Sequence, residues 1–235
     1  MKAFNISTLK RAQIALFLFT LPLSVNAEWS GGVEGGTVLD GDDSSTSLEL
    51  ILQNQSRPFS QEINAEWLSN QDGFNTYELS YEPKYWFSKM TYAFAEGAIK
   101  TFGSASLDDY QRLLGGGVGI ELINTETQNL FAEVGAYNIT SIVAATEFAP
   151  EFNESVVSSG FAVGGSQIVS DLIKLEVDAD YLTSDNIDRS TAEAGISVRI
   201  PNGALKYSFN YVSSTIGDQD AVSNSSSSIS VKYNF

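Results

Sequence analysis

Histidine and cysteine, two of the side chains that most often carry out chemistry in proteins, do not occur in this chain. Without histidine there is no Ser–His or Asp–His mechanism, and the commonest metal ligand is missing as well. A pair of carboxylates could still act as acid and base. With 29 Asp and Glu residues, however, some carboxylates come close together by chance. These residue types predict that the protein is not an enzyme and holds no dedicated cofactor.

Carboxylates do recur with a regular spacing. Glu176, Asp178 and Asp180 stand at every second position with apolar residues between them, so a β-strand would place all three on one face. If the apolar face of such segments meets lipid, the opposite face lines a lumen. The residues that we expect to govern ion selectivity there are Glu176, Asp178, Asp180, Glu78, Glu82, Lys84 and Arg199. The same face includes Glu34, Glu49, Glu62, Glu66, Glu121, Glu133, Lys174, Glu193, Lys206 and Lys232.

Acidic residues outnumber basic residues on this inward face. Buried charges that lack both partners and water cost on the order of several kcal/mol each. One interpretation is therefore a lumen filled with water, and a hydrated acidic pore prefers cations. The alternative is a narrow barrel that is filled by ion-paired side chains and conducts no ions.

The strands that position these residues follow from an alternation of apolar and polar side chains with a period of two. Most are long enough to cross a bilayer, which takes ~9–11 tilted residues. Short connections alternate with longer ones, as in outer-membrane barrels. The sequence thus predicts an all-β fold, a single antiparallel transmembrane barrel of about twelve strands, with ten as the alternative. The predicted strands are 29–39, 45–56, 59–69, 75–86, 90–101, 109–122, 128–139, 156–169, 172–183, 190–200, 204–214 and 225–235.

Acidic residues also gather in the longer connections, above all in the first one. Asp40, Asp42 and Asp43 lie close together there, and carboxylates suit Ca²⁺ or Mg²⁺. The segment lacks the spacing and the closing Glu of a calcium-binding loop, so we expect only weak binding of Ca²⁺ or Mg²⁺. The alternatives are that the charge serves hydration and repulsion, or that divalent ions bridge the loops to lipopolysaccharide.

Residues 1–27 have the features of a secretory signal. Lys2, Lys10 and Arg11 precede a short apolar run, and small residues around Ala27 form a cleavage site. The predicted domains are therefore a signal peptide at 1–27 and a barrel at 28–235. The formal charge of −16 argues against nucleic acid as a partner.

Aromatic residues are placed where a barrel would meet the two surfaces of the membrane. The residues that we expect in such a belt are Trp67, Tyr85, Trp86, Tyr207, Tyr211 and Phe235. Phe235 is also the last residue of the chain. Bacterial barrels commonly end in an aromatic residue that the barrel assembly machinery recognises, so this machinery is an expected partner.

Several short motifs occur along nearly the whole chain after Ala27. They are Trp29-Ser30-Gly31, Gly35-Gly36, Ser44-Ser45-Thr46-Ser47-Leu48, Tyr81-Glu82-Pro83-Lys84-Tyr85-Trp86-Phe87, Phe94-Ala95-Glu96, Tyr110 with Leu114-Gly115-Gly116-Gly117-Val118-Gly119, and Phe235. In these motifs the chain resembles the salt-induced outer-membrane protein family, a YdiY-like domain of unknown function. One departure is Asp40-Gly41-Asp42-Asp43, where the family often has a Gly-Asn-Thr type of turn. The resemblance implies an outer-membrane barrel and no assigned activity.

The sequence thus predicts an exported protein of the Gram-negative outer membrane, in contact with lipid and lipopolysaccharide. The expected role is adaptation of the envelope to salt, through a small cation-preferring pore. The alternative is a non-conducting structural or adhesion barrel whose acidic loops bind divalent cations, lipopolysaccharide or a partner.

Overall fold

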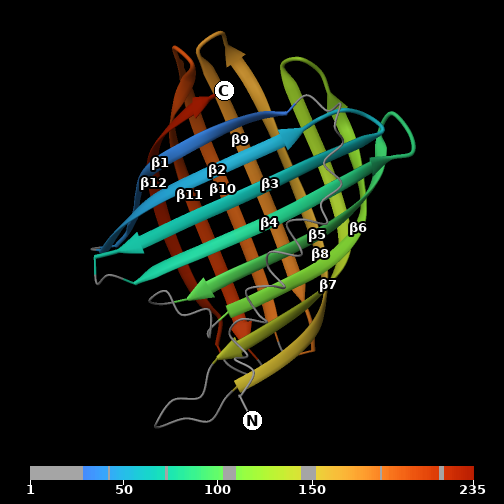
Figure 1. The fold of residues 1–235 in the computed structure, drawn as a ribbon, viewed down its shortest axis with the longest axis vertical. Helices are drawn as coiled ribbons and strands as arrows, with labels where there is room; N and C mark the ends of the chain where they lie inside the picture. The colour runs from blue at the N-terminus through green and yellow to red at the C-terminus, as the bar shows by residue number, and fades with distance from the viewer. Residues whose placement is uncertain are drawn as a thin grey trace, which may run out of the picture.

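The computed structural model describes residues 29–41, 43–71, 74–102, 110–143, 152–185, 187–216 and 220–235. Within these ranges twelve antiparallel strands close into one barrel (Figure 1). Each strand pairs with its neighbours in the sequence, and β12 returns to pair with β1. The strands are β1 (Ser30–Asp40), β2 (Asp43–Asn54), β3 (Phe59–Asn70), β4 (Asn75–Trp86), β5 (Thr91–Phe102), β6 (Tyr110–Asn124), β7 (Gln128–Val143), β8 (Phe152–Ser170), β9 (Ile173–Thr183), β10 (Ile187–Ile200), β11 (Gly203–Ile216) and β12 (Val222–Asn234).

The predicted fold class, an all-β barrel of about twelve strands, is confirmed. The predicted signal peptide, residues 1–27, lies outside the described residues. The part of the chain that is described includes no helix long and apolar enough to cross a membrane.

The outer surface of the barrel is apolar, because the alternation places large hydrophobic side chains on one face of every strand. Leu48 on β2, Val134 on β7 and Phe209 on β11 are each about half exposed to the surroundings. Such a surface is unfavourable in water and matches the lipid-facing band of a membrane barrel. Strands of 11 or 12 residues span roughly 36–40 Å along their axes, which a tilt brings close to the thickness of a bilayer.

The connections at one end of the barrel are short, and the chain ends there. The beginning of β1 pairs with the C-terminus at this end, where the Gly31 and Phe235 backbones exchange two hydrogen bonds of 3.1 and 3.0 Å. The turns between β8 and β9 and between β10 and β11 contain two residues each. We refer to this end as the short-turn end, which faces the periplasm in outer-membrane barrels.

At the opposite end two predictions about the connections were wrong. The segment 140–155 was expected to be a long loop, but β7 continues to Val143 and β8 already begins at Phe152. Asn138 donates a hydrogen bond of 2.9 Å to Ser155 across these two strands, so polar residues extend the hairpin. The first connection is also shorter than expected, since Asp40 pairs directly with Asp43 and Gly41 adopts a φ of 60°.

One sector of the interior is filled by aromatic rings that lie against glycines. A methyl group at Gly119 on β6 would overlap the ring of Tyr92 on β5, and one at Gly115 would overlap the ring of Tyr137 on β7. Tyr92 is only 1 % exposed. Only glycine permits rings to approach the backbone this closely, so the Gly-rich segment of β6 makes room for aromatic side chains inside the barrel.

Arg57, in the turn between β2 and β3, connects two turns and the end of a strand at the short-turn end. Its guanidinium donates to the Lys89 carbonyl oxygen at 2.6 Å and to the Glu121 carboxylate at 2.5 Å. It also lies 3.7 Å from the centroid of the Trp86 ring. These contacts join the turns after β2 and β4 to the end of β6.

Candidate permeation path through the barrel

The interior divides into a filled half and an open half. In the filled half, Lys84 on β4 contacts two carboxylates, Glu82 at 2.8 Å and Glu133 at 3.0 Å. The Tyr92 hydroxyl donates a hydrogen bond of 2.6 Å to Glu133. The tilted rings of Tyr92 and Trp86 have centroids 4.5 Å apart. Ion pairs and aromatic rings thus occupy the space inside β4–β8.

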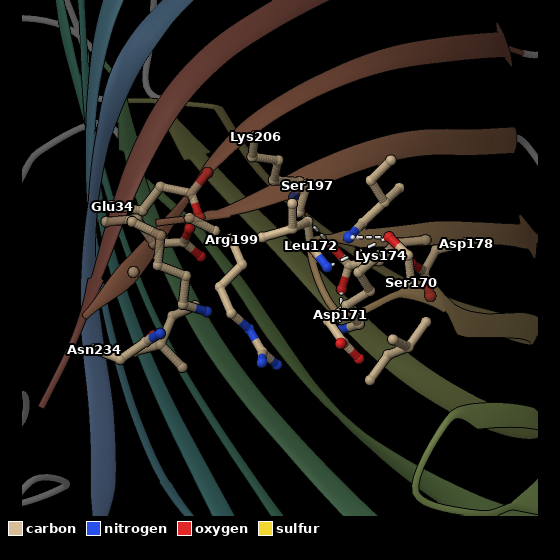
Figure 2. A pocket seen from close by; sticks show the side chains of 18 of the residues that line it. Glu34, Ser170, Asp171, Leu172, Lys174, Asp178, Ser197, Arg199, Lys206 and Asn234 are labelled. Carbon is tan, nitrogen blue, oxygen red and sulfur yellow. Dashed lines mark hydrogen bonds and ion pairs between the residues drawn. The ribbon is translucent and has the colours of Figure 1, made fainter. Parts of the chain in front are cut away.

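The open half lies inside β9–β12 and β1–β3. A cavity of about 670 Å³ reaches from the short-turn end into the barrel, and we call it the lower cavity. Figure 2 shows Glu34, Arg199 and Lys206 projecting from the wall into this space. Its charged lining residues are Glu34, Glu49, Glu62, Asp171, Lys174, Glu176, Asp178, Arg199, Lys206 and Lys232.

A second cavity of about 330 Å³ continues toward the opposite end, and we call it the upper cavity. Both cavities are lined by Glu34, Glu49 and Lys206, so they meet at these three side chains. The upper cavity is acidic and rich in hydroxyl groups; its further polar lining residues include Glu66, Glu193, Ser47, Ser208, Asn210, Ser226, Ser228 and Ser230.

A third cavity of about 390 Å³ opens at the short-turn end beside Arg57 and Trp86. It shares Glu62 with the lower cavity. Glu82 and Lys84 line this third cavity, so it borders the filled half of the barrel.

The carboxylates of the open half are only partly neutralised. Lys174 pairs with Glu176 at 2.5 Å, and Lys206 pairs with Glu193 at 3.2 Å. Among the described residues, no ion pair within 4.0 Å involves Glu34, Glu49, Glu62, Glu66 or Asp178. Glu34 instead accepts a hydrogen bond from the Ser230 hydroxyl, and Glu49 accepts one of 2.6 Å from Asn64. The open half therefore keeps a surplus of negative charge next to open space.

The residues expected to govern ion selectivity separate into two groups. Glu176, Asp178 and Arg199 line the lower cavity. Asp180 shares their face by register, because it pairs with Ala162, two positions from the Gly164–Asp178 pair. Glu78 belongs to the filled half, where it pairs with Lys100 at 2.9 Å, as do Glu82 and Lys84.

The expected aromatic belt contains one error, Trp86. Its ring contacts Arg57 and Tyr92, and its indole N–H donates to Ser60 at 3.3 Å. Trp86 follows Lys84 by two positions and therefore points inward, whereas Tyr85 is 55 % exposed on the outer face. The proximity of Trp86 to a short turn suggested a membrane interface, but the parity of the strand decides its direction.

The other belt residues lie on the outer face at different heights. Trp67 is near the end of β3 that lies opposite the short-turn end, and its indole N–H donates a hydrogen bond of 3.1 Å to Asn75. Tyr207 and the terminal Phe235 are exposed near the short-turn end, whereas Tyr211 stands in the middle of β11. Contact of these residues with the membrane interface stays a prediction.

The acidic first turn is described only in part. Asp40 accepts a hydrogen bond of 2.7 Å from Asn224 on β12, and Asp43 lies opposite Asp40. Asp42 lies outside the described residues. No group of three metal-ligating side chains occurs among the residues that the structure places. Binding of Ca²⁺ or Mg²⁺ at this turn stays a prediction.

Sequence reasoning did not find the aromatic residues that fill the interior. A signal was present, because Tyr92 and Phe94 share a face of β5 with the charged Glu96 and Lys100. The structure shows that this face points inward along its whole length, with Lys84 opposite Phe94 and Glu78 opposite Lys100. A single register runs through the β4–β5 pair, from Thr76 opposite Phe102 to Trp86 opposite Tyr92.

Solved structures of similar fold are porins and outer-membrane channels. The KdgM porin, in complex with disordered oligogalacturonate, has 10 % identity and a TM-score of 0.52, covering 88 % of this chain and 99 % of that one. The NanC porin has 11 % identity and a TM-score of 0.51, covering 86 % and 98 %. An outer membrane channel from Pseudomonas putida F1 has 10 % identity and a TM-score of 0.50, covering 89 % and 96 %.

The fold therefore defines the class, a closed antiparallel β-barrel like those of these outer-membrane proteins. Within that class, the chain belongs to DUF481, a family of proteins of unknown function, whose profile matches residues 32–235. This match confirms the resemblance to an outer-membrane family of unknown function that the sequence motifs indicated. No curated protein matches the chain in sequence.

Proposed function

We propose that this protein is an outer-membrane pore through which small cations pass along the open half of the barrel. The observation that carries the proposal is the meeting of the lower and upper cavities at Glu34, Glu49 and Lys206. Together the two cavities extend from the turn at Asp171 to Ser226, near the other end of the barrel.

Charge determines which ions such a path would favour. Where the two cavities meet, the path presents two carboxylates and one ammonium group, and that ammonium group is already paired with Glu193. Rings of acidic side chains attract cations and repel anions. A surplus of carboxylates facing water therefore supports K⁺ or Na⁺ as the permeant ion rather than Cl⁻.

The test is the conductance of the purified protein in planar lipid bilayers. With a KCl gradient across the bilayer, we expect discrete current steps and a reversal potential displaced toward the Nernst potential of K⁺. The double variant E34Q/E49Q is expected to move the reversal potential toward zero. The matched control is E126Q, which removes a charge from the exposed turn between β6 and β7.

Three outcomes would contradict the proposal. A folded protein without current steps would support the non-conducting structural or adhesion barrel. Current steps with a preference for Cl⁻ would contradict the role of the acidic lining. An equal effect of E126Q and E34Q/E49Q would show that general surface charge, rather than the path, sets the selectivity.

We connect the pore with adaptation of the envelope to salt, because the family that the chain resembles is described as salt-induced. An exported barrel of this kind contacts lipid and lipopolysaccharide through its apolar outer face, and its terminal Phe235 is available to the assembly machinery. A strain that lacks the protein is expected to grow more slowly at high NaCl than at high sucrose of equal osmolarity. Equal growth in the two media would contradict a salt-specific role.

A further inference from the structure

The lower cavity carries positive charges at its mouth. Lys174 is the second residue of β9, Arg199 is the last but one of β10, and Lys232 is the last but two of β12. All three positions are close to the short-turn end, and all three side chains line the lower cavity. We call these residues the basic rim. Lys174 is paired with Glu176, whereas Arg199 and Lys232 have no ion pair with any described residue.

Carboxylates line the same cavity from the adjoining strands β1, β2 and β3. Glu34 on β1, Glu49 on β2 and Glu62 on β3 stand three to five positions from the short-turn ends of their strands. None of them is within 4.0 Å of Arg199 or Lys232, although Glu34 and Lys232 are opposite each other in the register. In Figure 2, Arg199 and Glu34 extend into the cavity from different strands.

Opposite charges that face one water-filled space without touching create a field across it. A solute with only one sign of charge is attracted by one wall and repelled by the other. A small zwitterion is attracted by both walls when its anionic end faces the basic residues and its cationic end faces the carboxylates. Arg199 suits the anionic end, because a guanidinium binds a carboxylate with two parallel hydrogen bonds.

We propose that the mouth of the lower cavity binds zwitterionic solutes of the α-amino acid type. Their carboxylate lies on Arg199 and Lys232, and their ammonium group lies toward Glu34, Glu49 and Glu62. The cavity volume of about 670 Å³ falls in the range of small-molecule sites, roughly 300–1,000 Å³, and leaves space for water around an amino acid. This inference names a substrate class for the path and rests on the proposed function.

The experiment measures K⁺ current through single reconstituted barrels while solute is added on the short-turn side. Glutamine supplies separated charges with no net charge, and glycerol is the uncharged control. We expect glutamine to reduce the K⁺ current in a saturable manner. Glycerol is expected to cause no saturable reduction of the K⁺ current. If a K⁺ current is present but glutamine does not reduce it, this inference is overturned and the proposed pore stands. If no K⁺ current is seen at all, the proposed function is overturned.

Two variants locate the site. R199Q is expected to weaken the glutamine block about tenfold, since it removes the bidentate partner of the carboxylate. R189Q is the matched control, because Arg189 is on the same strand but ten positions closer to the other end, a separation of roughly 33 Å along the strand. Equal weakening in both variants would overturn the assignment to the basic rim. The comparison of glutamine with glycerol on the unaltered protein tests the inference even if R199Q fails to fold.

Discussion

The substitution K84M tests whether the ion cluster of the filled half stabilises the barrel. Lys84 is 25 % exposed and bridges Glu82 and Glu133, of which Glu133 is only 11 % exposed. Breaking a fully buried ion pair costs about 3–5 kcal/mol, and losing an exposed one costs about 0–1 kcal/mol. The intermediate burial of this cluster therefore predicts a loss of about 2–3 kcal/mol in the free energy of unfolding. The aliphatic stem of Met keeps most of the packing against the Tyr92 ring.

The assay is equilibrium unfolding in urea of the protein in lipid vesicles, followed by tryptophan fluorescence. Trp86 reports directly on the cluster because its ring contacts Tyr92. With a slope of about 2 kcal/mol per molar urea, the midpoint should fall by about 1 M. The control is K89M, a lysine in an exposed turn that has no ion pair among the described residues.

A midpoint for K84M equal to that of K89M would refute the reasoning, since the cluster would then contribute nothing. The double variant K84M/E133Q adds a second check. It removes one of the two stranded carboxylates, so its midpoint should lie above that of K84M alone. A further fall would mean that Glu133 stabilises the barrel mainly through its hydrogen bond from Tyr92 rather than through Lys84.

Three further predictions concern folding and assembly. G119V is expected to block the native packing of Tyr92, so the heat-modifiable gel band of folded protein should be lost; a normal band would show that the ring can move aside. R57A should lower the free energy of unfolding by about 1–2 kcal/mol, because charge-assisted hydrogen bonds and a cation–π contact are lost together; an unchanged urea midpoint would show that the two turns and the end of β6 are held independently. Removal of Phe235 should reduce the amount of folded barrel in outer-membrane fractions of cells without lowering its stability once purified; equal amounts in the membrane would contradict recognition of this residue.

Strand number and side-chain direction could be read from the sequence, because alternation and turn residues are local properties. The face that carries Glu176 and Asp178 was predicted correctly for this reason. Strand ends were less certain where polar residues continue a hairpin, as Asn138 and Ser155 do between β7 and β8. Where a strand continues beyond the membrane, polar residues can belong to the strand as well as to a loop. The apolar–polar alternation therefore does not mark where such a strand ends.

The division of the interior could not be read from the sequence. It depends on which inward-facing residues meet across the barrel, and that is settled by register and closure rather than by any one strand. Gly119 and Tyr92 are paired through the β5–β6 register, and neither residue alone indicates that the other is there. Likewise, Glu34 and Lys206 were both expected on the inward face, yet only the closed barrel brings them to one cavity.

Part of the long β7–β8 hairpin has a strand partner on one side only among the residues that the structure places. Residues 152–158 of β8 pair with β7, whereas pairing with β9 begins only at Ser159. This stretch extends roughly 23 Å along the strand beyond that point. On the β9 side its backbone groups pair with no strand of the described ranges, so they form an open sheet edge there.

Free edges tend to join other sheets, and charged side chains are a common means of preventing this. Glu154 and Asn153 lie on this stretch and are both exposed. The negative charge of Glu154 is therefore expected to disfavour pairing of this edge with the same edge of an adjacent barrel. We expect this charge to act on contacts between neighbouring barrels, independently of any ion that passes through them.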